Sequence, residues 1–413
     1  MFVNTQYNRK DKKMSLSSTN TVAKKMLDFM ESASWIRKMF EEGAVLKAKF
    51  GADKVFDFSL GNPDLPPPVS FQKILETVVA DQSPGVHSYM PNAGLLDVRS
   101  RIAAQVSIDQ QVYLGAEEII MTCGAAGGLN IIFKSLLNPN EEIIVPTPYF
   151  VEYGFYADNH NGKLVPVKSN PDFSLDIEAI ENGLNNKTKA ILLNSPNNPS
   201  GIIYSKQELE VVAKLLARAS DYFGHPIFLI SDEPYRRLVF TGSFVPPILK
   251  FYPNTILTTS FSKDLSIPGE RIGYVAVHPE ISHKTPLLGA LTLANRILGF
   301  VNAPALMQRI IGKVFDAKVD IEVYQRRRDL LAKILKEAGY TFTMPQGAFY
   351  FFPRTPIPDD IKFVRILQKE RILTVPGSGF GAPGHFRIAF CVDDEVIERS
   401  RKGFIRAMEM AKK

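Results

Sequence analysis

Short apolar runs alternate with longer amphipathic stretches from about residue 69 to residue 279. Amphipathic segments such as Ser205–Ala219 separate most of the apolar runs, with Leu209, Val212 and Leu216 on one face. This alternation predicts an α/β fold with a largely parallel, doubly wound sheet. The expected strands are Ile119–Met121, Ile143–Val145, Lys163–Val167, Ala190–Asn194, Ile227–Ser231, Thr255–Thr259 and Ile272–Val277.

The pattern changes after about residue 300. A long helical stretch is expected from about Asn302 to Glu337, and Ser34 to Phe50 is predicted to form a helix in which Trp35 packs. We therefore expect a large domain at residues 67–299, a smaller α+β domain at 34–66 and 300–413, and a disordered basic tail at 1–33. The other elements expected in the smaller domain are strands at Phe349–Phe352, Ile372–Val375 and Phe386–Phe390, a helix at Asp360–Lys369, and a last helix from Asp393 or Asp394.

Charge and composition narrow the classes of function. The chain carries a formal charge of +6, but residues 1–25 hold six basic residues against one acid. The remaining body is nearly neutral, which argues against nucleic acid as a partner. No apolar run approaches membrane-spanning length, so no membrane contact is expected, and the polar N-terminal segment does not resemble a secretory signal. Two cysteines, Cys123 and Cys391, suit neither a disulfide framework nor a zinc site, so we expect a cytoplasmic setting and no metal.

Two ionisable residues follow strands of the predicted sheet, where ligands of open α/β sheets gather. Lys263 closes the hydroxyl-rich segment 258–263, and Asp232 closes the apolar run Ile227–Ile230. A partly desolvated lysine amine is neutral often enough to attack an aldehyde, and a carboxylate can hold a cationic ring nitrogen. Each residue also has a plainer interpretation, because an isolated lysine is most often solvated and an aspartate can cap a helix or bind a metal.

Two loops and two arginines complete the candidates. The loop 194–201 is bent by two X-Pro steps and a glycine, and Asn198 in it can donate its amide to a ligand. The small residues 122–129 suit either a single phosphate at a helix N-terminus or close packing. Arg271 can pair with the same phosphate, and Arg387 at a strand start can hold a carboxylate, unless either forms a surface salt bridge.

Nine short motifs occur in order along the chain. They are SLGNPDL (59–65), YMPNAGLLDVR (89–99), TCGAAGGL (122–129), PTPYFVEY (146–153), SPNNPSG (195–201), SDEPY (231–235), SFSKDLSIPGERIGY (260–274), QGAFY (346–350) and FRIAF (386–390). Together they resemble the class I/II aminotransferases of pyridoxal phosphate (PLP) fold type I, from about Trp35 to the C-terminus. The resemblance implies a mostly parallel seven-stranded sheet with a smaller α+β domain, PLP as cofactor, and a homodimer with shared active sites.

The resemblance also implies a role for each matching residue. Lys263 carries PLP as a Schiff base and moves the substrate proton, and Asp232 pairs with the pyridine nitrogen. Asn198 and the catalytic Tyr235 bind the phenolic oxygen. Further roles are implied for Tyr149 on the ring face, for Ser260, Ser262, Arg271 and the backbone of Gly124, Ala125 and Ala126 at the phosphate, for Tyr89 at the phosphate of the neighbouring subunit, and for Arg387, Gly61, Asn198 and Arg296 at the substrate.

These roles predict a transaminase that moves the amino group of an L-amino acid to a 2-oxo acid, expected to be 2-oxoglutarate, by a ping-pong mechanism. Acidic or aromatic amino acids are the expected donors, and Arg296 is the candidate partner of a side-chain carboxylate. A C–S β-lyase or another non-transaminating enzyme of this fold stays an alternative, because all use the same PLP contacts. A PLP-binding regulator is less favoured, since the residues before Trp35 are too few and too polar for a winged helix.

Overall fold

The computed structural model describes residues 21–32 and 35–413, except for the side chains of residues 31–41. The expected packing of the Trp35 side chain lies outside the described residues, as does most of the predicted tail.

Helix α1 (Lys24–Ser32) lies inside the segment predicted to be disordered. It docks on α6 (Glu152–Asn159), where the Phe29 ring meets the Phe155 ring edge-on at a centroid distance of 4.9 Å. Lys25 of α1 also pairs with Asp158 of α6. The prediction of a disordered tail is therefore wrong for residues 24–32, because α6 supplies them with a packing partner.

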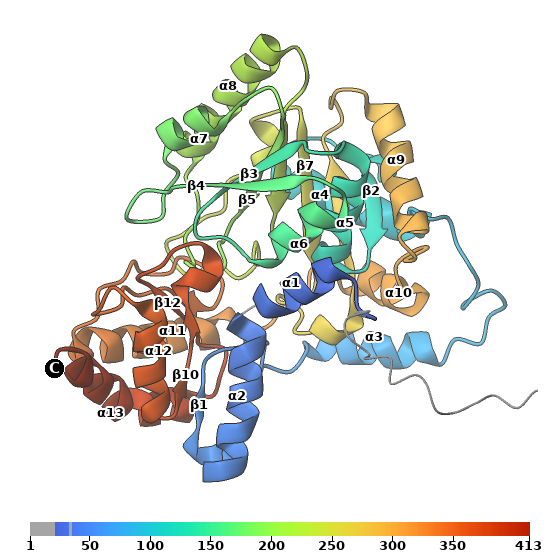
Figure 1. Ribbon diagram of the computed structural model, residues 1–413. Coiled ribbons are helices and arrows are strands. Elements are labelled where there is room, and N and C mark those ends of the chain that lie inside the picture. Colours follow the sequence, from blue (N-terminus) through green and yellow to red (C-terminus); the bar gives the residue numbers. More distant parts are fainter. Residues whose placement is uncertain (1–20, 33–34) are drawn as a thin grey trace, which may run out of the picture.

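Seven strands form the main sheet in the order β2-β8-β7-β6-β5-β3-β4 (Figure 1). All neighbours pair in parallel except β8, which runs antiparallel to both β2 and β7. The mostly parallel seven-stranded sheet is thus confirmed, and each strand falls within two residues of its predicted position. The strands are β2 Ile119–Thr122, β3 Glu142–Pro146, β4 Lys163–Val167, β5 Thr188–Asn194, β6 Phe228–Asp232, β7 Thr255–Ser260 and β8 Gly273–Val277.

Apolar side chains cover both faces of this sheet. Successive strand residues point to opposite faces, so Ile143 and Val145 of β3 join one buried cluster while Ile144 joins the other. One face packs against α5 (Gly124–Leu136), α6 and α9 (Lys284–Ile297). The opposite face packs against α4 (Leu96–Gln110), α7 (Ile177–Gly183), α8 (Lys206–Phe223) and α10 (Ala305–Val314). The sheet is therefore doubly wound, and its central strands are buried, as the near-continuous apolar runs indicate, whereas the edge strand β4 is partly exposed.

A second group of elements joins the N-terminal part of the chain to its C-terminal part. Figure 1 shows α2 and β1 (blue) beside the C-terminal helices and strands (orange to red). Strand β1 pairs with β10, and β11, β12 and β9 form an antiparallel sheet of three strands. The bounds are α2 Trp35–Phe50, β1 Phe56–Asp57, α11 Ile321–Ala338, β9 Tyr350–Phe351, α12 Asp360–Lys369, β10 Ile372–Leu373, β11 Val375–Pro376, β12 Phe386–Ala389 and α13 Asp394–Ala411. Helix α3 (Val69–Val79) packs instead on α10.

The long helix expected over residues 302–337 is two helices, α10 and α11. Between them, the carbonyl oxygens of Phe315 and Asp316 accept hydrogen bonds from the Arg237 guanidinium at 2.7 and 2.8 Å. The Val319 N–H donates to the Asp264 carbonyl at 2.7 Å. Tertiary partners thus satisfy backbone groups that a continuous helix would pair internally, and the prediction of one helix is wrong for that reason.

None of the helices in the described part of the chain is long and apolar enough to cross a membrane.

The contact between α5 and β7 generates the first prediction. A Cβ added at Gly128 of α5 would lie 2.1 Å from Thr258 Oγ1 of β7, so Gly128→Ala forces the helix away from the sheet. We expect the variant to lose about 1–3 kcal/mol of unfolding free energy, measured as a lower thermal midpoint. The control is Gly289→Ala in α9, where an added Cβ meets nothing within 4 Å and is expected to be neutral or stabilising. Equal midpoints for the two variants would contradict the tight contact.

Candidate active site

The candidate site lies at the carboxyl ends of the central strands. In the register of the sheet, Asn194 at the end of β5 stands beside Asp232 at the end of β6. Antiparallel β8 begins opposite Ser260 at the end of β7, which brings the preceding Arg271 to the same edge. A cavity of about 360 Å³ opens there. The predicted site residues that line it are Gly61, Ala125, Ala126, Asn198, Asp232, Tyr235, Ser260, Ser262, Lys263, Arg271 and Arg387.

Lys263 presents its amine to this cavity. Its Nζ donates a hydrogen bond to the Gly61 carbonyl at 2.9 Å. Burial lowers the pKa of Lys263 to about 8, and the positive charges of Arg387 and Arg271 act in the same direction. A substantial fraction of the amine is therefore neutral near physiological pH, as a nucleophile or base must be.

Asp232 is buried, and only one of its two carboxylate oxygens accepts a hydrogen bond from a described residue. The Tyr153 hydroxyl donates to Oδ2 at 2.5 Å, whereas Oδ1 has no hydrogen-bond partner among the described residues. Burial raises the pKa of Asp232 to about 7, although the Tyr153 hydrogen bond opposes this shift. A buried carboxylate oxygen without a partner is costly, so this atom is suited to a ligand that carries a proton or a positive charge.

The N-terminus of α5 forms another wall of the cavity. Ala125 and Ala126 lie in the first turn of this helix, and the side chains of Ser260, Ser262 and Arg271 stand around it. The first-turn N–H groups of a helix have no partner within the helix, and the helix dipole favours an anion there. This wall therefore fits a phosphate.

Gly124 begins α5 with a positive φ of 73°. A Cβ at this position would lie 2.9 Å from Nη2 of Arg271. The absence of a side chain thus allows the arginine to lie against the start of the helix.

Arg387 is buried at the opposite end of the cavity. Its Nη2 donates to the Ser59 carbonyl at 2.6 Å and its Nη1 to Oδ1 of Asn198 at 3.1 Å, while its Nε has no partner in the described part of the chain. The guanidinium is sandwiched between the rings of Tyr350 and Phe380, at 4.7 and 4.9 Å from their centroids. Among the described residues no carboxylate pairs with it, so the guanidinium fork is available for a carboxylate ligand.

Two tyrosines connect the ends of the cavity. The Tyr235 and Tyr350 hydroxyls form a hydrogen bond at 2.8 Å. A Cβ at Gly61 would lie 1.9 Å from the Tyr350 hydroxyl oxygen, so this position requires glycine. Tyr350 belongs to the QGAFY motif, but sequence reasoning attached no role to it.

Three of the predicted site residues lie away from this cavity. Tyr149 bonds through its N–H to the Phe380 carbonyl and packs its ring on Gly381, so that its neighbour Phe150 lines the cavity instead. Tyr89 is 90% exposed and Arg296 is exposed in the last turn of α9. Within this chain, neither reaches the cavity that Lys263 lines.

Comparison with known proteins now adds to this geometry. Residues 53–403 match the family model of the class I and II aminotransferases. A probable aspartate/prephenate aminotransferase of Aquifex aeolicus is 32% identical over 378 residues, which cover 88% of this chain and 93% of that protein. An asparagine–oxo-acid transaminase of Streptococcus mutans is 30% identical over 363 residues, which cover 84% of this chain and 89% of that protein.

A solved structure agrees with these matches. The crystal structure of an amino transferase from Eubacterium rectale superposes with a TM-score of 0.92 at 38% identity, and covers 95% of this chain and 100% of that one. The chain belongs to the class I and II aminotransferases. It is therefore a PLP-dependent transaminase of fold type I, with amino acids and 2-oxo acids as its substrates.

The transaminase cavity fits PLP on three observations. The unpartnered Oδ1 of Asp232 suits a protonated ring nitrogen, the α5 N-terminus suits the phosphate, and the partly neutral Lys263 suits the aldehyde. Sequence reasoning missed Tyr153, the hydrogen-bond donor to Asp232, and Phe150 and Glu152 beside it. All three lie in the PTPYFVEY motif, so the motif marked the right segment of the chain. The motif did not indicate which of its side chains point into the cavity.

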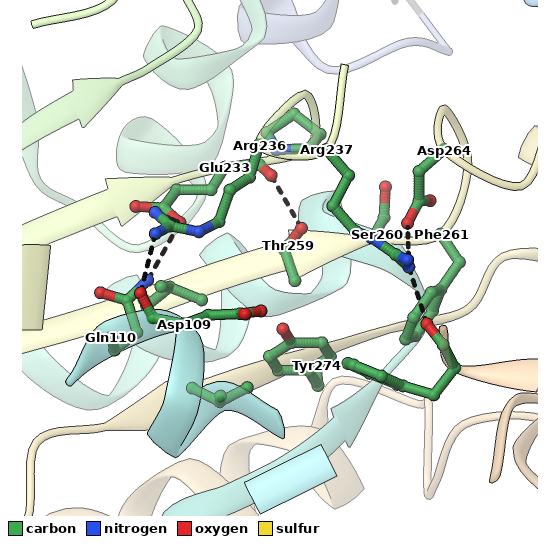
Figure 2. Close-up of a pocket in the computed structure, with 14 residues that line it drawn as sticks. Asp109, Gln110, Glu233, Arg236, Arg237, Thr259, Ser260, Phe261, Asp264 and Tyr274 are labelled. Carbon is green, nitrogen blue, oxygen red and sulfur yellow. Dashed lines mark hydrogen bonds and ion pairs between the residues drawn. The ribbon is translucent and has the colours of Figure 1, made fainter. Parts of the chain in front are cut away.

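Two ion pairs anchor the chain segments that carry Asp232 and Lys263 in the transaminase. A second, smaller cavity of about 30 Å³ shares Pro234 and Ser260 with the first. Figure 2 shows the residues that line it. Beside it Glu233, which follows Asp232, pairs with Arg236 at 3.0 Å. Asp264, which follows Lys263, pairs with Arg237 at 3.1 Å. Each catalytic residue is thus followed by a buried carboxylate that anchors its segment.

The uncompensated Asp232 carboxylate generates a prediction on stability. The pKa of Asp232 is raised to about 7 in the folded protein, whereas an unfolded chain releases this proton from about pH 4 upward. Between these pH values the folded state binds more protons than the unfolded state, so the free energy of unfolding falls as pH rises toward 7. We expect cofactor-free Asp232→Asn to have a higher thermal midpoint than the cofactor-free wild type at pH 8, with a gap that narrows toward pH 5.

Exposed Asp221→Asn in α8 is the control and should show no such pH-dependent gap. A wild type more stable than Asp232→Asn at pH 8 would contradict the buried, unpaired carboxylate.

Proposed function

We propose that this transaminase moves the amino group of an L-amino acid to a 2-oxo acid in two successive half-reactions at one site, with 2-oxoglutarate as acceptor. The observation that carries the proposal is the convergence of Lys263, Asp232 and Arg387 on one cavity. These residues supply an amine, a carboxylate and a guanidinium, which match an aldehyde, a ring nitrogen and an α-carboxylate. Because the second substrate needs the same contacts as the first, ping-pong kinetics are expected.

We assign the contacts to PLP as follows. Ser260, Ser262, Arg271 and the first turn of α5 at Gly124, Ala125 and Ala126 hold the phosphate. Asp232 would accept a hydrogen bond from the protonated ring nitrogen, and the positive charge of that nitrogen would keep the carboxylate ionised. Asn198 and Tyr235 bind the phenolic oxygen, and Phe150 takes the ring-face position first assigned to Tyr149. When bound, PLP withdraws electrons from the substrate α-carbon and so stabilises the carbanion.

Lys263 acts as the base that moves a proton from the substrate α-carbon. The lowered pKa of about 8 leaves part of the amine unprotonated, and its hydrogen bond to Gly61 holds it in the cavity. Such proton transfer contributes a factor of about 10²–10⁴ to an enzymatic rate.

Arg387 binds the substrate α-carboxylate, with the backbone near Gly61 alongside. Its buried guanidinium is already oriented by Asn198, Ser59 and two aromatic rings, so little side-chain entropy is lost when a carboxylate binds.

We further propose a homodimer with shared active sites. Tyr89 is 90% exposed and thus accessible to the phosphate site of a neighbouring subunit. Arg296, exposed at the end of α9, is the candidate to reach a neighbour's substrate from outside this chain's cavity. We also propose a large domain at 67–299 and a smaller one at 34–66 and 300–413, with residues of both lining the cavity. Helix α10, although it lies in the smaller domain by this division, packs against α3 and α4 of the larger one.

Loss of Lys263 tests the cofactor assignment. PLP added to the wild type is expected to give a visible absorption band that borohydride fixes onto Lys263. Lys263→Ala should lose this label and slow the conversion of PLP to its amine form by an amino acid at least about 100-fold. Label on another lysine, found by peptide mass spectrometry, would overturn the assignment. Pyruvate and ammonia released from a cysteine conjugate, with no 2-oxo acid formed, would favour the β-lyase alternative.

Substitution of Arg387 tests the α-carboxylate site. Arg387→Lys removes the two-pronged hydrogen bonding and is expected to raise the KM for amino acid donors at least about tenfold. The internal control is an amine that lacks an α-carboxylate, which should react equally slowly with both proteins. If the variant slowed that amine as much as it slowed the amino acids, Arg387 would not be the carboxylate site.

A further inference from the structure

Glu152 is an unpaired acidic side chain on the wall of the catalytic cavity. It is the first residue of α6, is half-buried, and lines the cavity next to Phe150, Tyr153 and Tyr156. Its carboxylate forms no hydrogen bond or ion pair with any described residue. Burial raises the pKa of Glu152, which is the expected effect of a carboxylate held near apolar rings with no cation beside it.

The other ionisable groups that line the cavity already have roles in the proposed function. Asp232 and Tyr153 are buried at its base, where the ring nitrogen is placed. Lys263, Arg271 and Arg387 are the basic residues of the cavity lining, and they serve the aldehyde, the phosphate and the α-carboxylate. None of the three pairs with Glu152.

Part of the lining is left for a substrate side chain. Leu60, Glu152 and Tyr156 are half-buried or exposed lining residues with no role assigned above, whereas Phe150 is already placed on the ring face of PLP. Burial raises the pKa of the Tyr156 phenol most, the negative charges of Glu152 and Asp232 raise it further, and the positive charge of Arg271 lowers it. Among the described residues without an assigned role, this part of the lining thus offers an aromatic ring, an aliphatic side chain and one charged group, the Glu152 carboxylate.

We propose that Glu152 is a specificity-determining residue, which favours amino donors whose side chains end in a hydrogen-bond donor, as an amide or a cation does, over donors that end in a carboxylate. This inference rests on the proposed function and extends it to the substrate class. A carboxylate that approaches Glu152 meets like charge in a partly desolvated site, whereas an amide N–H or a cation supplies the missing partner. It replaces the expectation of acidic donors and, with it, the role of Arg296 as partner of a side-chain carboxylate. Among the described residues, the cavity of this chain has no cation beyond Lys263, Arg271 and Arg387, which are already assigned.

The position of Glu152 also affects binding of the proposed amino acceptor, 2-oxoglutarate. 2-Oxoglutarate brings a distal carboxylate to this wall, so Glu152 must take up a proton or turn toward solvent when it binds. The raised pKa of Glu152 reduces the cost of protonation. 2-Oxoglutarate is therefore tolerated as an acceptor, at a cost in KM that removal of the Glu152 charge should relieve.

The test compares amide and acid donors of the same shape. Purified holoenzyme is mixed with L-glutamine or L-glutamate, and with L-asparagine or L-aspartate, and the conversion of bound PLP to its amine form is followed by absorbance. We expect the wild type to favour the amide of each pair by at least about tenfold in kcat/KM. Glu152→Gln should abolish most of this preference, chiefly through faster reaction with the acids, and should lower the KM for 2-oxoglutarate.

Exposed Glu178→Gln in α7 is the matched control and should keep the wild-type ratios. Amide-to-acid ratios in Glu152→Gln within twofold of the wild type, with donors still reacting, would overturn this inference alone. If no amino acid converted the bound cofactor in the wild type, the proposed function would fall and this inference with it. Binding of glutarate to the holoenzyme, read from the cofactor absorbance, gives a second measurement without turnover, and Glu152→Gln should tighten it.

Discussion

The parallel pairing of β5, β6 and β7 is the constraint on which the active site depends. Because the three strands end in register, Asn194, Asp232 and the segment that leads to Lys263 meet at one edge of the sheet. Antiparallel β8 then returns the chain to the same edge, so that Arg271 joins them. Apolar clusters cover both faces of the sheet and keep water from its backbone hydrogen bonds. The catalytic groups are thus placed by a rigid scaffold.

The scaffold buries Asp232 and Arg387 and half-buries Lys263, which limits how far water can hydrogen-bond to them or screen their charges. Burial raises the pKa of Asp232 to about 7 and lowers that of Lys263 to about 8, so the two values approach each other. Oδ1 of Asp232 and Nε of Arg387 are buried without hydrogen-bond partners among the residues that the structure describes. A pyridinium supplies the hydrogen-bond donor that Oδ1 lacks, and an α-carboxylate supplies the acceptor that Nε lacks. Binding of cofactor and substrate therefore offsets the free-energy cost of burying these two atoms without partners.

Different parts of the chain supply the two ends of the cavity. The large sheet and the start of α5 form the end that suits the cofactor, whereas Arg387 of β12 and Tyr350 of β9 form the end that suits a carboxylate. One buried apolar cluster runs from the large sheet into the smaller one, which fixes the distance between the ends. Ion pairs of Glu233 and Asp264 anchor the catalytic segments from behind.

The sequence by itself determined the seven strands of the large sheet, several helices and the residue types at the strand ends, because these follow from local periodicity and chain order. Lys263, Asp232, Arg271 and Arg387 became candidates in this way, and the family resemblance of the motifs supplied their roles. Only the tertiary structure decided that Phe150 rather than Tyr149 lines the cavity, that Tyr153 bonds to Asp232, and that Glu152 lines the cavity without a partner among the described residues. It likewise decided the docking of α1 and the break between α10 and α11. Each of these depends on a partner distant in sequence, and periodicity carries no information about such partners.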